Sequence, residues 1–316
     1  MSAHTQSHGH QHRHDHRSGS TDSDSTDIDW EAMADTLEIN GDLHLPTLRQ
    51  TATRLAELLG PDKQVRRILD IGSGPGVMTC VLAEAFPDAQ VVAVDGAPTL
   101  LDRALARAER LGLDDRVAIR HAELPGDLEG GDGQAGGGLG EADLIWSSKA
   151  VHHVGDQQGV LDALAGALRP GGMLAVAEGG LPMRFLPRDI GIGTPGLQAR
   201  LDAMQEFWFE RMRSELPGST STVEDWPAML GQAGLTDVSS FTYLLDLPAP
   251  LGETARTFVR NQLTRLRDVM SESLEADDRK TLDILLDDTA PNGILRRPDA
   301  FVLSATTVFA GVRRAS

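Results

Sequence analysis

The chain has 316 residues and a formal net charge of −18, because 47 acidic side chains outnumber 29 basic ones. Surfaces for nucleic acid or anionic lipid need clustered Lys and Arg, so this charge argues against both partners and favours a small-molecule ligand. Cys80 is the single cysteine, which excludes an intrachain disulfide, and there is no apolar leader and no apolar run of about 18 residues. We expect a cytoplasmic protein with no membrane span.

Residues 1–29 are rich in His, Ser, Asp and Gly and have almost nothing apolar to bury, which predicts a disordered tail. Five of the histidines alternate with other residues, at His8, His10, His12, His14 and His16. Their imidazoles could chelate a divalent ion, or the segment could be a solvated tail without a bound metal. Carboxyl and thiol partners at structural-site spacing are missing, so the solvated tail is favoured and no metal site is predicted.

Residues 30–61 are predicted to form one or two amphipathic helices. Apolar side chains recur there at helical spacing, at Trp30, Met33, Leu37, Leu48, Leu55, Leu58 and Leu59. Gly60 and Pro61 end the pattern. The helices either cover a binding site or pack on the sheet.

The stretch 67–79, R-I-L-D-I-G-S-G-P-G-V-M-T, combines a buried strand, a glycine loop and a helix start. Glycines at positions 72, 74 and 76 let the chain turn sharply and bring bare backbone N–H groups to a ligand. A dinucleotide loop would place its third glycine at position 77, which is Val77, and no Gly-Lys-Ser/Thr of a phosphate-binding loop follows. The alternative to a ligand loop is a tight turn only.

The strand predicted at 91–94 ends at Asp95, which lies 23 residues after Gly72. A carboxylate at such a strand tip accepts both hydroxyls of a ribose, and nucleotide-binding folds place one about 20 residues beyond the glycine loop. Asp95 could instead cap the next helix, but Pro98 lies closer to that helix start, so ribose binding is favoured.

Three further strands are predicted, at 116–120, 142–146 and 173–177. The glycine-rich segment 129–140 is interpreted as a surface loop. S-S-K-A-V-H-H-V follows the strand at 142–146, at the strand end where open α/β sheets place their active sites. L-R-P-G-G at 168–172 predicts a helix stop and a turn before the last of the three strands, which ends at Glu178.

These motifs resemble the class I S-adenosylmethionine-dependent methyltransferases of small molecules. D-x-G-x-G-x-G at 70–76 resembles their motif I, and H-H-V-x-D, L-R-P-G-G and a strand ending in an acid extend the resemblance over 65–178. No N/D-P-P-Y/F motif follows the fourth strand, which disfavours methylation of nucleic acid bases. His121 replaces the family's usual Asp beside adenine and leaves Glu123 or a backbone group for that contact. The resemblance implies S-adenosyl-L-methionine as cofactor, with contacts from Asp70, Gly72, Ser73, Gly74, Gly76, Asp95, Gly96 and Glu123.

The resemblance weakens after Glu178. A helix is predicted from Thr194-Pro195 to Met212, and its aromatic residues 207–209 either line a substrate pocket or simply pack. A strand at 235–247, two inserted helices and a last strand at 301–312 fit the antiparallel end of the family's sheet. The inserted helices are the candidate lid.

The predicted fold class is α/β, a Rossmann-like seven-stranded, mostly parallel sheet with helices on both faces, N-terminal helices and helical lid insertions. The predicted segments are the tail 1–29, the N-terminal helices 30–61, the cofactor-binding core 62–180, and 181–316 with the lid and the strands that complete the sheet. The predicted function is methyl transfer to a small molecule, of unknown oligomeric state. The alternatives are an NAD-dependent oxidoreductase, opposed by Val77, and a non-catalytic cofactor-binding regulatory protein.

Oxygen is the predicted methyl acceptor, with His152 or His153 as general base. A hydroxyl is a poor nucleophile until its proton leaves, and imidazole titrates near neutral pH. Both histidines follow the fourth strand, so the neighbouring fifth strand should bring Glu178 close enough to orient an imidazole, as in some sugar O-methyltransferases that this stretch resembles. The alternative is that one histidine packs on the sheet and the other caps the next helix.

Overall fold

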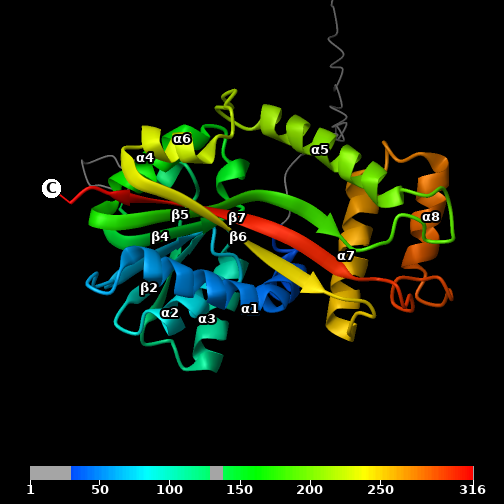
Figure 1. Ribbon diagram of the computed structural model, residues 1–316, viewed down its shortest axis with the longest axis horizontal. Coiled ribbons are helices and arrows are strands. Elements are labelled where there is room, and N and C mark those ends of the chain that lie inside the picture. The colour runs from blue at the N-terminus through cyan, green and yellow to red at the C-terminus, as the bar shows by residue number, and fades with distance from the viewer. Residues whose placement is uncertain (1–29, 129–137, 316) are drawn as a thin grey trace, which may run out of the picture.

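A seven-stranded sheet forms the centre of the molecule (Figure 1). The computed structural model describes residues 30–128 and 138–315, so the predictions for the tail 1–29 and for residues 129–137 lie outside the described residues. The strand order is β3-β2-β1-β4-β5-β7-β6; the first five pair in parallel and β7 is antiparallel to both its neighbours. The predicted α/β fold class is confirmed. The strands are β1 (Arg67–Ile71), β2 (Gln90–Asp95), β3 (Val117–His121), β4 (Ala142–Ser148), β5 (Leu168–Arg184), β6 (Leu235–Leu247) and β7 (Val302–Arg313).

Helices cover both faces of the parallel part of the sheet. Ile68 and Leu69 are neighbours in β1 and both are fully buried, yet they belong to two different hydrophobic clusters. Because successive side chains of a strand point to opposite faces, the sheet is buried on both sides, which explains why its strands read as continuous apolar runs. The covering helices are α2 (Val77–Ala85), α3 (Pro98–Leu111), α4 (Gln157–Gly166) and α6 (Trp226–Gln232).

The chain order of the strands reverses at β1, which lies between β2 and β4. In open α/β sheets such a reversal opens a crevice outside the carboxyl ends of the strands, and ligands bind there. The glycine loop after β1, Asp95 at the end of β2 and the loop after β4 all leave the sheet at this edge. The topology therefore gathers the predicted site residues from distant parts of the chain.

The N-terminal segment forms one helix, α1 (Ala34–Leu59), which resolves the prediction of one or two helices. Its second half packs on the sheet through Leu48 and Leu55, whereas Ile39 and Leu43 in its first half contact the inserted helices. A Cβ placed on Gly41 would lie 2.4 Å from Val77 Cγ2, so α1 passes very close to the start of α2. The helix thus both packs on the sheet and borders the crevice.

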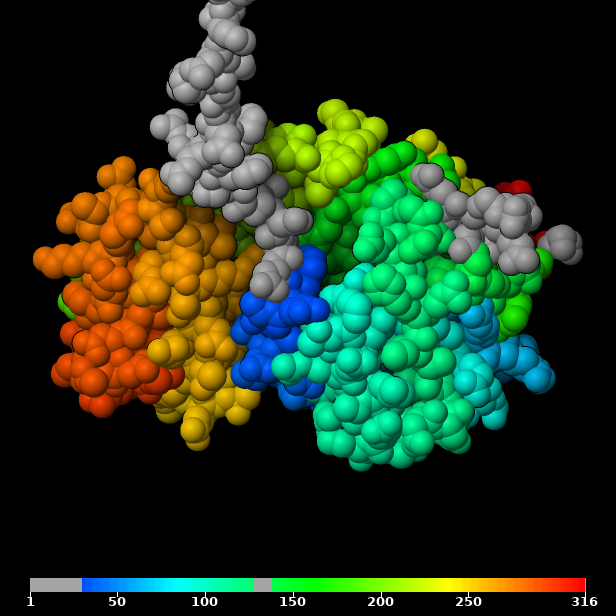
Figure 2. All heavy atoms as spheres, turned by 180° about the vertical axis from the view of Figure 1, so that it is seen from behind, coloured from blue at the N-terminus to red at the C-terminus, as the bar shows by residue number. Residues whose placement is uncertain are grey.

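The insertions form a second body of packed helices on the extended ends of β5, β6 and β7 (Figure 1). It contains α5 (Leu197–Glu215), α7 (Glu253–Val269) and α8 (Ala276–Leu286), around fully buried Phe258, Leu263 and Leu282. Figure 2 shows the start of α1, in blue, between α7 and α8, in orange, and the core, in cyan and green. The two inserted helices predicted before the last strand are α7 and α8.

Strand β5 differs from its prediction at both ends. The expected turn at 168–172 is part of the strand, and its pairing with β4 shifts register there, with Gly171 at φ 71°. The expected end at Glu178 was also wrong, because β5 continues to Arg184 by antiparallel pairing with β7. That pairing joins segments more than a hundred residues apart, so no local pattern signals it. In the described ranges no helix is both long and apolar enough to cross a membrane.

Candidate active site

The glycine loop has one open position between two closely packed ones. Gly72, Gly74 and Gly76 all adopt positive φ, at 67°, 53° and 74°. A Cβ on Gly72 would lie 2.5 Å from Ala150 Cβ, and one on Gly76 would lie 2.5 Å from Ala104 Cβ. Gly74 has nothing within 4 Å of its Cβ position. Two glycines are therefore required by packing, while the backbone at Gly74 faces open space where a ligand can approach.

Asp95 holds this loop in place. Its Oδ2 accepts a hydrogen bond from the Gly74 N–H at 2.8 Å and its Oδ1 accepts one from the Ala97 N–H at 2.9 Å. A carboxylate offers about four lone-pair sites, so both oxygens retain capacity for ligand hydroxyls. The Ser73 hydroxyl is buried and has no partner among the described residues. The loop and the strand end thus offer unused polar atoms beside the open position.

Asp70 lies beneath the loop. It is 2% exposed, and Thr79 Oγ1 donates a hydrogen bond of 2.5 Å to its Oδ2. Burial raises the pKa of Asp70 to about 7, and the nearby charge of Asp95 also raises it. Asp70 therefore ties the end of β1 to the first turn of α2, and direct contact with a cofactor stays a prediction.

Gly96 and Glu123 lie together at the rim of the crevice. Glu123 Cγ is 3.6 Å from the Cβ position of Gly96, and both residues are exposed. The His121 Nε2 lies 3.0 Å from the Gly96 carbonyl oxygen. The ends of β2 and β3 thus bring Glu123 beside Gly96, as adenine recognition at this edge would require.

His152 and Glu178 form a hydrogen-bonded pair. The 3-10 turn η2 (Val151–His153) follows β4, and Glu178 comes from β5 next to it. Glu178 Oε2 lies 2.7 Å from His152 Nδ1, and its Oε1 accepts from the Val151 N–H at 3.1 Å. The carboxylate side chain is 3% exposed and the imidazole 18%. A proton on Nδ1 leaves Nε2 with its lone pair, which is the arrangement of a general base oriented by an acid.

His153 has different surroundings. Its ring centroid lies 5.1 Å from that of Trp30, edge-on, and 4.2 Å from that of His152. Burial lowers the pKa of His153 to about 3, and the neighbouring His152 together with the positive charges of Arg265 and Arg213 lowers it further. His153 is therefore neutral at neutral pH and has no carboxylate partner that the structure describes. Of the two predicted bases, His152 has the favourable geometry.

Lys149 lies in the same crevice and was missed by sequence reasoning. It has φ of 52°, which is rare outside glycine, and its side chain is exposed. The surrounding protein nevertheless lowers the pKa of Lys149 through burial, with Glu178 opposing the shift. No local sequence signal marks this lysine.

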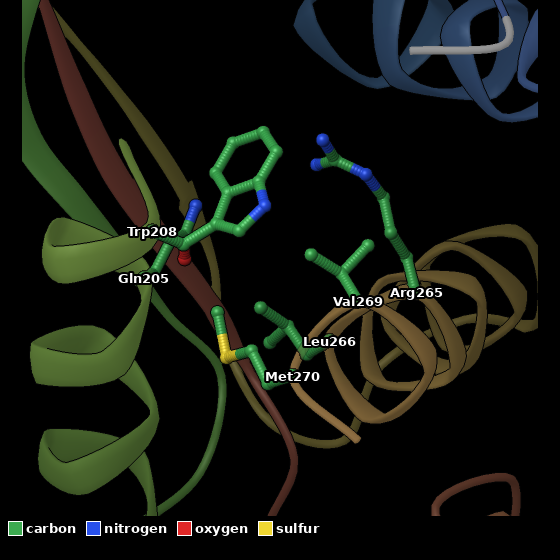
Figure 3. A pocket seen from close by; sticks show the side chains of 6 residues that line it. All are labelled: Gln205, Trp208, Arg265, Leu266, Val269 and Met270. Carbon is green, nitrogen blue, oxygen red and sulfur yellow. The ribbon is translucent and has the colours of Figure 1, made fainter. Parts of the chain in front are cut away.

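The inserted helices reach the pair from the other side. Arg213 of α5 donates from Nη1 to the carbonyl oxygens of His152, at 3.0 Å, and of Val154. The Phe209 ring lies 5.4 Å from the His152 ring, and Trp208 lines a small pocket between α5 and α7 (Figure 3). Of the three consecutive aromatic residues, Phe209 contacts His152 and Trp208 lines the small pocket. Phe207 is 68% exposed, so it neither lines a pocket nor packs in the core.

A methyltransferase-domain family model matches residues 69–174, which hold the glycine loop, Asp95 and both histidines. Residues 69–174 therefore form a class I S-adenosyl-L-methionine-dependent methyltransferase domain. This family assignment replaces the oxidoreductase alternative, in agreement with Val77.

Curated methyltransferases resemble part of the chain. It is 32% identical over 169 residues to a trans-aconitate 2-methyltransferase of Methylobacterium radiotolerans, covering 48% of this chain and 57% of the relative. It is 30% identical over 206 residues to the 27-O-demethylrifamycin SV methyltransferase of Amycolatopsis mediterranei, covering 62% and 66%. The chain thus spans less than two thirds of the length of either relative. A solved structure, phosphoethanolamine N-methyltransferase 2 of Haemonchus contortus with S-adenosyl-L-methionine, has a TM-score of 0.47 at 17% identity and covers 92% of this chain and 61% of that one.

The residues of the crevice fit the cofactor of this methyltransferase family. The family's cofactor carries amino, carboxylate and ribose hydroxyl groups, and the crevice offers the unpaired hydroxyl of Ser73 and the carboxylate of Asp95 beside the open space at Gly74. These are donors and acceptors of the right kinds at the carboxyl edge of the sheet. The N–H groups of the glycine loop are bonded within the protein, that of Gly74 to Asp95, so they are not the free donors expected from the sequence. The individual contact of each residue stays a prediction.

Proposed function

We propose that this methyltransferase transfers a methyl group to a hydroxyl oxygen of a small molecule, with His152 as general base. One observation carries the proposal: the 2.7 Å hydrogen bond between His152 Nδ1 and Glu178 Oε2 at the carboxyl edge of β4 and β5. The pair opposes a non-catalytic cofactor-binding protein, for which a buried carboxylate aimed at an imidazole has no use.

The proposed chemistry needs little from the protein beyond alignment, proton removal and exclusion of water. When bound, S-adenosyl-L-methionine supplies an electrophilic methyl group and leaves as a neutral thioether. His152 Nε2 accepts the hydroxyl proton as the oxygen–methyl bond forms. Glu178 holds the ring and stabilises the imidazolium that results. Asp95 and the backbone at Gly74 hold the cofactor side of the crevice.

The walls of the crevice suit a reaction that must exclude water. Trp30 packs on His153, Phe209 on His152, and α1 borders the glycine loop through Gly41. These contacts come from the N-terminal helix and from the insertions, the two regions predicted to cover the site. Alignment of two reactants in one site supplies much of the rate enhancement of a bimolecular transfer.

The proposal is tested by incubating the protein with candidate hydroxyl-bearing small molecules and cofactor labelled in its methyl group. Mass spectrometry identifies a labelled product, and carbon NMR assigns the atom that carries the label. We expect a methyl ether. A label on nitrogen, carbon or sulfur, or on a carboxylate oxygen that needs no base, would show that base-assisted transfer to a hydroxyl is wrong while leaving the family assignment in place.

A further inference from the structure

Arg265 of α7 is a half-buried cation without an acidic partner among the described residues. It does not take part in any ion pair or hydrogen bond there, and its one contact of note is the Trp208 ring, whose centroid lies 5.9 Å from its guanidinium carbon. Burial lowers the pKa of Arg265, with no acid opposing the shift. A charge taken partly out of water without a counter-charge raises the free energy of the free protein. A bound anion would remove that penalty.

The other arginines of α7 are all paired. Arg260 forms an ion pair of 2.8 Å with Asp288, Arg267 one of 3.0 Å with Asp268, and Arg256 donates to backbone carbonyl oxygens that include Arg297 O. Arg265 therefore lacks a charged partner in the described part of the chain because it lies on the face of α7 that is turned toward α5. That face borders the site.

The charge of Arg265 acts on His153, the chain neighbour of the proposed base. Arg265 lines a small pocket with Trp208, Gln205 and three apolar residues at the end of α7, and Figure 3 shows its guanidinium and the Trp208 indole facing each other across that pocket. Phe209, next to Trp208 in the chain, contacts the His152 ring, and the charge of Arg265 acts on His153. A ligand group held at Arg265 is thus close to the imidazole pair.

The charge of the whole chain makes this local cation significant. A protein of net charge −18 repels anions, so an anionic acceptor needs cations placed at its site. Arg265 lies on the insertion side of His152 and Lys149 on the sheet side, and Arg213 adds a third positive charge. Glu178 offsets one of these three charges, so the two arginines leave an excess of positive charge around the pair although the chain as a whole is acidic.

We propose that Arg265 and Trp208 form an acceptor subsite for a carboxylate, so that the substrate class is small hydroxy acids. The guanidinium pairs with the carboxylate, and the indole face packs on the planar or apolar body that joins it to the reacting hydroxyl. Lys149 adds positive potential without being the anchor. This inference rests on the proposed methyl transfer to oxygen, and Arg265 acts in it as a specificity-determining residue.

Binding is measured by calorimetry on the protein saturated with S-adenosylhomocysteine, so that no turnover is required. The probes are matched pairs of hydroxybenzoates and hydroxycinnamates with their uncharged amides. Wild-type protein should bind at least one acid more tightly than its amide. Arg265→Gln should lower the affinity for that acid about 10- to 100-fold, to the level of the amide, because a charge-assisted pair is lost. Arg267→Gln, which removes the same charge from an ion-paired position of the same helix, should leave the preference unchanged.

Three outcomes overturn the subsite: no acid is preferred over its amide, Arg265→Gln keeps the preference, or Arg265→Gln lowers only the melting temperature, as a purely structural cation–π contact would. The proposed function fails separately. If acid binding depends on Arg265 but no acceptor is methylated, the subsite stands without that function. If uncharged hydroxyl compounds are methylated equally by wild type and Arg265→Gln, the function stands without the subsite.

Discussion

An alanine at Gly74 should separate cofactor binding from folding. Gly74 has φ of 53° and nothing within 4 Å of its Cβ position, so the added methyl meets no protein atom. The remaining cost is that of a left-handed L-residue, about 1 kcal/mol of folding free energy. The same methyl projects into the space where the cofactor is expected to bind. We predict that Gly74→Ala lowers affinity for S-adenosyl-L-methionine roughly tenfold or more.

Gly112 provides the matched control. It ends α3 with φ of 67°, also has nothing within 4 Å of its Cβ position, and lies away from the crevice. Urea denaturation should show that Gly112→Ala and Gly74→Ala lose a similar free energy of unfolding, about 1 kcal/mol. Calorimetry should then show a loss of cofactor affinity in Gly74→Ala alone. Wild-type affinity in Gly74→Ala, or an equal loss in both variants, would refute the placement of the cofactor at this loop.

Three further predictions concern residues around the loop and the histidine pair. Asp95→Ala removes the acceptor for the Gly74 N–H and should weaken cofactor binding at least about tenfold by calorimetry; unchanged affinity would exclude a role for this carboxylate. Because the pKa of Asp70 is raised to about 7 in the folded protein, the native state binds the extra proton, and stability is lost as pH rises from about 4 to 7, by up to about 4 kcal/mol. Asp70→Asn should abolish that part of the pH dependence in denaturation curves, and identical profiles would contradict it. Arg213→Gln frees the carbonyl oxygens of η2 and should lower kcat about tenfold with cofactor affinity intact; a matching fall in cofactor affinity would instead indicate wider disruption.

Features that depend on neighbouring residues could be predicted from the sequence. The strand ending at Asp70 and Ile71, the three glycines and the acid at the end of β2 form one local pattern, and the structure places them at one edge of the sheet. The approach of Glu178 to His152 follows from the pairing of β4 with β5, which the order of motifs already indicated. The role of each residue in catalysis or cofactor binding stays a prediction.

Features that depend on distant packing could not be predicted. The extension of β5 to Arg184 requires β7, and the positions of Arg213 and Arg265 beside the histidines require the folding of α5 and α7 over the sheet. The choice between His152 and His153 also needs the structure, because adjacent residues of one turn face different partners, Glu178 and Trp30. Sequence spacing does not contain that information.

The central claim is tested most directly by single-turnover methyl transfer at saturating cofactor in His152→Ala and His153→Ala, two adjacent substitutions of the same size. The account predicts that His152→Ala lowers the rate about a hundredfold or more, with cofactor affinity nearly unchanged, because a general base is lost. His153→Ala should have a much smaller effect, since a pKa lowered to about 3 makes His153 a weak base and it lacks a carboxylate partner among the described residues. Near-normal turnover in His152→Ala would contradict the account.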